Sequence, residues 1–268
     1  MNTSIPTNAR LNTASTTPAG TTGPALSARG LSKSYQSPVL TKLDLDIEQG
    51  QFVAIMGPSG SGKSTLLHCL SGMDRPDAGS VLLGGTDITS LNEKELAALR
   101  LTRFGFVFQQ AHLMTTLCLL DNIVLPGFLA GLRPRPEVTA RGEELMERMG
   151  IAELATSGVT EVSGGQLQRA GICRALINDP GIVFADEPTG ALNSATALQI
   201  LDLLGEIHAS GTTLVMVTHD TQVAARADRV LVLVDGQITE DLLLGKYEEA
   251  EGPSRLATVT EALQRHSV

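Results

Sequence analysis

The chain has 268 residues, a hydrophobic content of 42% and a formal net charge of −9, so it is long enough for one large α/β domain or two small ones. The acidic balance argues against a general nucleic-acid-binding protein, because affinity for a phosphate backbone comes from clustered Lys and Arg. The three widely spaced cysteines (Cys69, Cys118 and Cys173) form no C-x-x-C pair, so we expect a reducing compartment and neither a disulfide framework nor a cysteine metal site.

The beginning of the chain is polar and rich in Thr, Ala, Pro and Asn. It lacks the apolar stretch of a signal peptide, and no apolar run in the sequence approaches the roughly 20 residues that span a bilayer. We interpret residues 1–25 as a disordered tail; a tag, a targeting segment or a regulatory arm are the alternatives. The sequence therefore predicts a cytoplasmic protein that would reach a membrane only through a partner.

Strand and helix patterns then follow in turn. The stretch 43–47 (LDLDI) alternates apolar and polar residues and predicts a half-buried strand, and 51–56 (QFVAIM) is a short apolar run that predicts a buried one. A helix is expected over 62–69 and beyond. A second helix is expected after the N-x-x-E capping-box spacing at 92–95. The run 104–108 (FGFVF) predicts another strand.

Helical periodicity replaces the strand patterns from about 110 to 165. A helix predicted over 137–150 places Leu145, Met146 and Met149 on one face. This segment is therefore expected to form a largely helical subdomain.

Three later apolar runs, 182–185, 213–217 and 229–234, predict strands with helices between them. Strands that alternate with helices favour a mainly parallel sheet covered on both faces. The residues that follow are polar and weakly patterned. We expect one α/β domain over 26–245 and a C-terminal extension over 246–268.

The segment 57–64 (GPSGSGKS) matches the phosphate-binding loop pattern G-x-x-x-x-G-K-[ST]. Glycines let successive N–H groups turn inward around an anion, and the helix that follows adds its positive N-terminal end. Lys63 would reach the β- and γ-phosphates of a nucleotide, Ser64 would ligate Mg²⁺, and Thr65 would add a hydroxyl near the α-phosphate. A plain Gly/Ser-rich turn is the alternative. The predicted nucleotide contacts are Gly57, Pro58, Ser59, Gly60, Ser61, Gly62, Lys63, Ser64 and Thr65.

Two adjacent carboxylates, Asp186 and Glu187, end the apolar run at 182–185. Ligands bind at the carboxyl ends of strands in open α/β sheets. Asp186 would hold Mg²⁺, directly or through water, and Glu187 would orient and deprotonate the attacking water. The alternative is that the two carboxylates cap the turn at Pro188. Together with the phosphate loop, they predict Mg²⁺-dependent hydrolysis of ATP.

The segment 162–166 (VSGGQ), followed by Leu-Gln-Arg, closely resembles the L-S-G-G-Q signature of ATP-binding-cassette ATPases, with Val in place of Leu. The resemblance runs from about residue 26 to 245. It implies a P-loop core with a mainly parallel sheet, an N-terminal antiparallel β-subdomain and an inserted helical subdomain at about 110–165. A serine and two glycine amides at a helix N-terminus would also make a second anion site.

The resemblance further implies that the signature of one subunit covers the ATP held by the phosphate loop of another. The active form would be a head-to-tail dimer around two ATP molecules, and a second copy of the chain is the expected partner. A plain loop-to-helix start is the alternative. The predicted residues of this contact are Ser163, Gly164, Gly165 and Gln166.

Other positions match the family in order. The resemblance implies that Gln109 contacts Mg²⁺ and water, and that His219 holds the γ-phosphate together with Glu187. It also implies that Tyr35 stacks on adenine, with base stacking worth roughly 1–3 kcal/mol. A purely structural histidine and a tyrosine that only packs are the alternatives.

One departure is Asn193, which stands where most cassettes have Asp. It lacks the charge expected to communicate across the dimer and could simply cap the next helix. The stretch 190–194 (GALNS), with 172–178 (ICRALIN) and 242–247 (LLLGKY), resembles the branch that handles antimicrobial peptides such as bacitracin. That branch is related to macrolide exporters and lipoprotein-releasing ATPases.

The expected function is that of an ATPase subunit driving a separate integral-membrane permease, on the inner face of the cell membrane, for export of or resistance to antimicrobial peptides or drugs. The segment 111–120 is a candidate for docking the permease, unless its leucines belong to the core. One alternative keeps the same ATPase but uses it for signalling or cell-wall regulation without transport. The other is a cassette that acts on DNA or ribosomes, which the acidic balance disfavours.

Overall fold

The computed structural model describes residues 23–266, so most of the tail predicted over 1–25 lies outside the described residues. The strands are β1 (Leu26–Ser34), β2 (Pro38–Ile47), β3 (Phe52–Met56), β4 (Ala78–Leu83), β5 (Thr86–Asp87), β6 (Phe104–Phe108), β7 (Ile182–Asp186), β8 (Thr213–Val217), β9 (Arg229–Val234) and β10 (Gln237–Leu243). The helices are α1 (Lys63–Leu70), α2 (Glu93–Arg103), α3 (Leu119–Ala130), α4 (Arg135–Arg148), α5 (Gly164–Leu176), α6 (Ser194–Ala209), α7 (Thr221–Ala224) and α8 (Gly252–Arg265), with short 3₁₀ helices at Ala152–Leu154, Val159–Glu161 and Glu249–Glu251.

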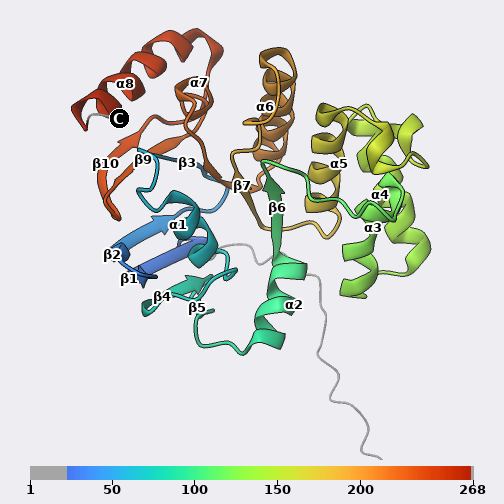
Figure 1. The fold of residues 1–268 in the computed structure, drawn as a ribbon, viewed down its shortest axis with the longest axis horizontal. Helices are drawn as coiled ribbons and strands as arrows, with labels where there is room; N and C mark the ends of the chain where they lie inside the picture. Colours follow the sequence, from blue (N-terminus) through green and yellow to red (C-terminus); the bar gives the residue numbers. More distant parts are fainter. Residues whose placement is uncertain (1–22, 267–268) are drawn as a thin grey trace, which may run out of the picture.

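The larger sheet has six strands in the order β10-β9-β3-β8-β7-β6. Four of its five pairings are parallel, and the edge pair β9–β10 is antiparallel. Every residue of β3 and β8 is buried, because helices cover both faces of the sheet (Figure 1). The α/β fold with a mainly parallel sheet is confirmed.

The smaller sheet has four strands in the order β2-β1-β4-β5, and its pairings are antiparallel. Its buried face packs against α1 and one face of the larger sheet in a single apolar cluster, with Leu26 and Val81 from the small sheet and Leu66 and Leu70 from α1. The helix α1 therefore lies between the two sheets (Figure 1). This is the antiparallel β-subdomain that the sequence predicts.

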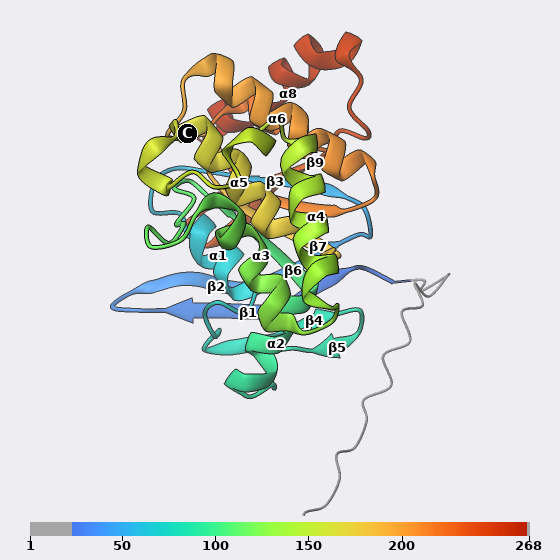
Figure 2. The ribbon, with the colours of Figure 1, turned by 90° about the vertical axis from the view of Figure 1, so that its right-hand side faces the viewer.

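A group of helices is inserted between β6 and β7 and consists of α3, α4 and α5 (Figure 2). The predicted apolar face of α4 is confirmed, since Leu145, Met146 and Met149 are all buried. Buried Asn122 of α3 accepts a hydrogen bond from the N–H of Met114 at 2.6 Å and donates to three carbonyl oxygens of the loop before α3. The helix α3 thereby fixes the loop that precedes it.

Local predictions also hold where the pattern was strong. The helix α2 begins with a complete capping box, in which Asn92 accepts from the N–H of Glu95 and Glu95 accepts from the N–H of Asn92. Among the described residues, no helix combines the length and the apolar character needed to cross a bilayer.

The C-terminal part is more ordered than its composition suggests. The strand β10 pairs with β9 through a turn at Asp235-Gly236, where both residues have positive φ, which is typical of a tight hairpin. The helix α8 buries Val259, Ala262 and Leu263. These three positions have the i, i+3, i+4 spacing of one helix face, and the polar residues between them hid this pattern in the sequence.

Candidate functional site

The predicted catalytic residues lie at the carboxyl edge of the large sheet. In β7, Asp186 pairs with Phe108 of β6 and Val217 of β8. The residues that follow these three strands therefore leave the sheet at the same edge. Gln109, Glu187 and His219 are brought together in this way, although they are far apart in the sequence.

The phosphate loop follows β3 and reaches α1 by a sharp turn at Gly57, where φ is +147°. A Cβ at this position would lie 2.0 Å from the carbonyl oxygen of Leu233 in β9. Only glycine therefore lets the loop pass this close to the sheet.

The ammonium group of Lys63 lies inside the loop, where it donates to the carbonyl oxygens of Gly57 at 2.9 Å and Pro58 at 2.7 Å. Burial lowers the pKa of Lys63, while the nearby carboxylates of Glu187 and Asp186 oppose that shift. A groove of about 490 Å³ opens in front of the loop. Its lining residues are Val39, Gly57, Ser59, Gly60, Gly62, Lys63, Ser64, Thr65, Glu187 and His219. Val39 reaches this groove through the β1–β2 hairpin, and no motif in the sequence marks it.

Oxygen atoms converge beside this groove. The hydroxyl of Ser64 donates to Oδ1 of Asp186 at 3.2 Å. Burial raises the pKa of Asp186, against the effects of the Ser64 hydrogen bond and the charge of His68, so a cation here would relieve the cost of the buried charge. An adjoining cavity of about 570 Å³ is lined by Ser64, His68, Phe108, Gln109, Gln110, His112, Asp186 and Glu187. Hydroxyl and carboxylate oxygens are the ligands that Mg²⁺ prefers.

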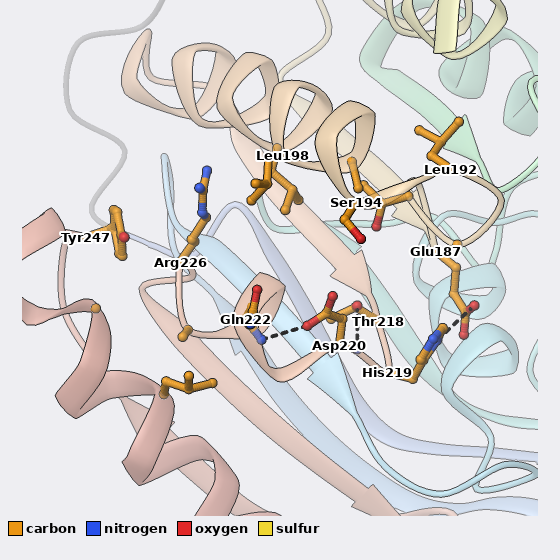
Figure 3. A pocket seen from close by; sticks show the side chains of 17 residues that line it. Glu187, Leu192, Ser194, Leu198, Thr218, His219, Asp220, Gln222, Arg226 and Tyr247 are labelled. Carbon is orange, nitrogen blue, oxygen red and sulfur yellow. Dashed lines mark hydrogen bonds and ion pairs between the residues drawn. The ribbon is translucent and has the colours of Figure 1, made fainter. Parts of the chain in front are cut away.

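The side chain of Glu187 lies between Lys63 and His219. Its Oε2 is 3.1 Å from Nδ1 of His219 (Figure 3), and its N–H donates to the carbonyl oxygen of Val217 at 2.9 Å. Glu187 has φ +46°, a left-handed conformation that is unusual for a residue with a side chain and that is concentrated at functional sites. A Cβ on Gly190 would lie 2.9 Å from Nε2 of Gln109 and 3.2 Å from Oε2 of Glu187. The two side chains therefore meet beside Gly190.

The signature residues form the start of α5. Ser163 caps the helix by accepting from the N–H of Gln166, and Oε1 of Gln166 accepts in return from the N–H of Ser163 at 2.8 Å. A Cβ on Gly165 would lie 2.5 Å from the side chain of Thr196, which packs this end of α5 against the start of α6. None of the residues from Ser163 to Gln166 lines the two cavities around Lys63 and Asp186. In one chain, the signature and the phosphate loop are thus separate.

Tyr35 is 62% exposed and lies after β1. Its hydroxyl donates to Oδ2 of Asp74 at 2.6 Å, and this hydrogen bond raises the pKa of Tyr35, as does burial. The ammonium group of Lys33 lies 5.1 Å from the ring centroid. The ring does not line the groove of the phosphate loop, but its exposed part is free to stack on a base.

Two further residues of α5, for which no motif in the sequence predicts a role, bond to the backbone on either side of Gln109. Nε2 of Gln168 donates to the carbonyl oxygen of Phe108 at 2.8 Å. The guanidinium of Arg174 donates to the carbonyl oxygens of Ala111 at 2.7 Å and His112 at 2.9 Å. These side chains therefore hold the backbone before and after Gln109 by hydrogen bonds.

Contacts bear on two of the open alternatives. Asn193 caps α6, since its side chain accepts from the N–H of Thr196 at 3.0 Å. In the segment 111–120, Leu119 is fully buried in the core whereas Met114 is 52% exposed, so the segment contributes to both the core and the surface.

The sequence matches one family model and several curated proteins. The family model described as ABC transporter matches residues 40–190. The macrolide export ATP-binding/permease protein MacB 1/2 of Paracoccus denitrificans (strain Pd 1222) is 45% identical over 240 residues, which cover 88% of this chain and 36% of that protein. The macrolide export ATP-binding/permease protein MacB of Rhodopseudomonas palustris (strain BisB18) is 46% identical over 218 residues, which cover 80% of this chain and 33% of that protein. The chain thus spans about a third of the length of these curated relatives.

Solved structures agree with the sequence comparison. The dimeric structure of MJ0796, a bacterial ABC transporter cassette, has a TM-score of 0.77 and 36% identity, covering 83% of this chain and 100% of that chain. A dimeric post-hydrolysis state of the same cassette bound to ADP and Pi has a TM-score of 0.74 and 35% identity, with the same coverage. Since the family model matches more than half of the chain, the chain belongs to the ABC transporter family, as one of its ATP-hydrolysing cassettes.

Proposed function

We propose that the chain hydrolyses ATP to drive an integral-membrane permease that exports macrolide-like drugs or antimicrobial peptides. One observation carries the ATPase part of the proposal: Glu187 and His219 face the loop ammonium of Lys63 across one groove. The names of the relatives, macrolide export ATP-binding/permease proteins, support the transport part.

In the proposed reaction, the loop N–H groups and Lys63 hold the phosphates, and Lys63 neutralises charge that develops on the transferred phosphoryl group. Glu187 accepts a proton from the attacking water as the water attacks the γ-phosphate. His219, 3.1 Å from Glu187, orients the carboxylate and contacts the γ-phosphate. Gln109, whose side chain lies next to that of Glu187, also positions the water.

Ser64 and Asp186 would hold Mg²⁺, with Gln109 as a further oxygen ligand. The fit rests on the 3.2 Å contact between Ser64 and Asp186 and on the buried carboxylate of Asp186, which has no neighbouring Lys or Arg within ion-pair distance among the described residues. When bound, Mg²⁺ would offset the negative charge of the nucleotide phosphates.

A second copy of the chain would complete each ATP site. The signature from Ser163 to Gln166 caps a helix of 13 residues and does not line the groove of its own chain. The N–H groups of Gly164 and Gly165, which the capping box does not use, are therefore available to the γ-phosphate on a partner. Dimeric neighbours in the family support this arrangement. Tyr35 would stack on the adenine through its exposed ring.

Docking to the permease is proposed at a cavity of about 440 Å³ between α2, β6, α3 and α5. It includes Met73, Leu101, Phe108, His112, Pro126 and Arg174. Arg174 holds the backbone just after Gln109. A segment that enters this cavity would therefore act on Gln109 through Arg174. The chain would then sit on the cytoplasmic face of the membrane.

The test is to isolate the tagged full-length chain from its host. The expected result is a membrane complex that contains a permease and hydrolyses Mg-ATP, and a host that loses macrolide or peptide resistance when Glu187 is replaced by Gln. Isolation without a membrane protein, or a wild-type complex without ATPase activity, would contradict the proposal. An ATPase-active membrane complex whose loss leaves drug accumulation unchanged would favour the signalling alternative.

A further inference from the structure

The position of His219 depends on the short helix α7, which starts immediately after it. The turn between β8 and α7 is closed by two hydrogen bonds, from the N–H of Asp220 to Oγ1 of Thr218 at 3.1 Å and from the N–H of Gln222 to Oδ1 of Asp220 at 2.8 Å. The turn is therefore continuous with α7. A shift of α7 would move the imidazole away from Glu187.

On one side, this turn faces open space. A cavity of about 430 Å³ separates it from α6 and extends from Glu187 and His219 to Tyr247 and Leu256 in the C-terminal segment (Figure 3). A four-residue helix has almost no stability of its own. On the α6 side, Arg226, just after α7, forms an ion pair with Asp202 at 2.5 Å, and packing from other elements supplies the rest of the support.

The helix α7 packs mainly on β3 and on α8. Val223 and Ala224 of α7 belong to the same buried cluster as Val259 and Leu263 of α8. The helix α8 thus packs against α7 and also contacts β9, and Figure 1 shows α7 and α8 next to each other at the same end of the molecule.

Arg255 fastens α8 to the loop between α7 and β9. Its side chain is only 4% exposed and donates to the carbonyl oxygen of Ala227 at 2.8 Å, and to those of Gly245 at 2.6 Å and Lys246 at 2.9 Å. The guanidinium also lies 5.4 Å from the ring centroid of Tyr247. A buried charge is costly unless it is fully hydrogen-bonded, so replacement of Arg255 is expected to loosen α8 from this junction.

We propose that α8 is a positioning element for ATP hydrolysis and that Arg255 is its positioning residue. By holding the loop that follows α7, Arg255 keeps α7 in place and His219 within 3.1 Å of Glu187. Arg255 touches neither nucleotide nor water, and it acts only through α7 and His219. This inference rests on the proposed ATPase mechanism.

The test is Arg255→Met in the full chain or its membrane complex. Because a small misplacement of a catalytic group is enough to slow a reaction strongly, kcat is expected to fall by about 10–100-fold, while KM for ATP and the affinity for Mg-ATP stay unchanged. Arg255→Lys keeps a donor and should recover part of the loss. The matched control is Glu240→Ala, which frees the far end of α8 by removing the contacts of Glu240 with Arg265 and His266 and should leave kcat unchanged.

Arg255→Met in a His219→Ala background separates positioning from general destabilisation. If Arg255 acts through His219, Arg255→Met will lower kcat no further once the imidazole is gone. An equal loss in both backgrounds, or a folded Arg255→Met chain with normal kcat, overturns the inference. If Arg255→Met does not fold, Val259→Ala is compared in the same two backgrounds with the same criteria. This substitution truncates a side chain of α8 in the apolar cluster that α8 shares with α7. Failure of the wild-type chain to hydrolyse ATP would instead contradict the proposed function itself.

Discussion

Nδ1 of His219 lies 3.1 Å from Oε2 of Glu187, although the two residues end neighbouring strands 32 positions apart in the chain. The pair depends on the parallel register of β7 and β8, in which Asp186 lies beside Val217. The left-handed backbone of Glu187 then turns its carboxylate toward the phosphate loop. The sheet thereby supplies the geometry of the pair.

Glu187→Gln is expected to lower kcat by on the order of 10²–10⁴-fold, because the amide cannot accept the proton of the attacking water. Binding of ATP should remain, since the loop and Lys63 are unchanged. Phosphate release and nucleotide binding by calorimetry measure the two effects separately. Glu206→Gln, at an exposed carboxylate on α6, is the control. Undiminished turnover in Glu187→Gln would remove its assigned role.

Lys63→Ala should weaken nucleotide binding itself. Hydrogen bonds to charged groups are worth about 1.5–3 kcal/mol, so we expect a Kd for Mg-ATP about 10–100 times larger. Lys94→Ala removes an exposed ammonium on α2 and should bind ATP normally. Equal affinities for the two variants would contradict the role of the loop lysine.

Ser163→Ala removes the cap of α5. The lost hydrogen bond to the N–H of Gln166 should lower the free energy of unfolding by about 1 kcal/mol. Asn92→Ala removes the cap of α2 at a similar cost, so the two variants match in stability. Only Ser163→Ala should also slow ATP hydrolysis by the dimer. If both variants retain full activity, the signature serine acts as a cap alone.

Folding stability should depend on pH through His208 and Asp228. Nε2 of His208 lies 3.2 Å from Oδ2 of Asp228, and this hydrogen bond raises the pKa of His208. A raised pKa in the folded state stabilises the fold fully below the unfolded value of about 6.5, and that stabilisation is lost as the pH rises through the folded pKa. Urea unfolding between pH 6 and 9 measures it. His208→Gln should flatten the curve in this range, and an unchanged slope would exclude the pair as its source.

The sequence predicted those parts of the fold and site in which chemistry dictates a local pattern. The loop from Gly57 to Ser64, the apolar run before Asp186 and the capping box at Asn92 all depend on neighbours in the chain. Their residue types are sufficient to reveal them.

Other features arise only from tertiary packing. Gln168 and Arg174 bond carbonyl oxygens about 60 positions away, and carbonyl acceptors leave no trace in a sequence. The helix α8 was missed because Arg255, a charged residue, is buried in it. Val39 enters the nucleotide groove by strand pairing alone.

The closeness of Gly57 to the backbone of β9 has an evolutionary consequence. Any side chain there would collide with a main-chain oxygen 2.0 Å away, which no rotamer change can relieve. At Gly60, where φ is +81°, a Cβ would meet no protein atom within 4 Å, so backbone strain, which Asn tolerates best, is the protein's own obstacle to substitution. A saturation library selected for folding should therefore keep glycine alone at the first position and admit asparagine at the second.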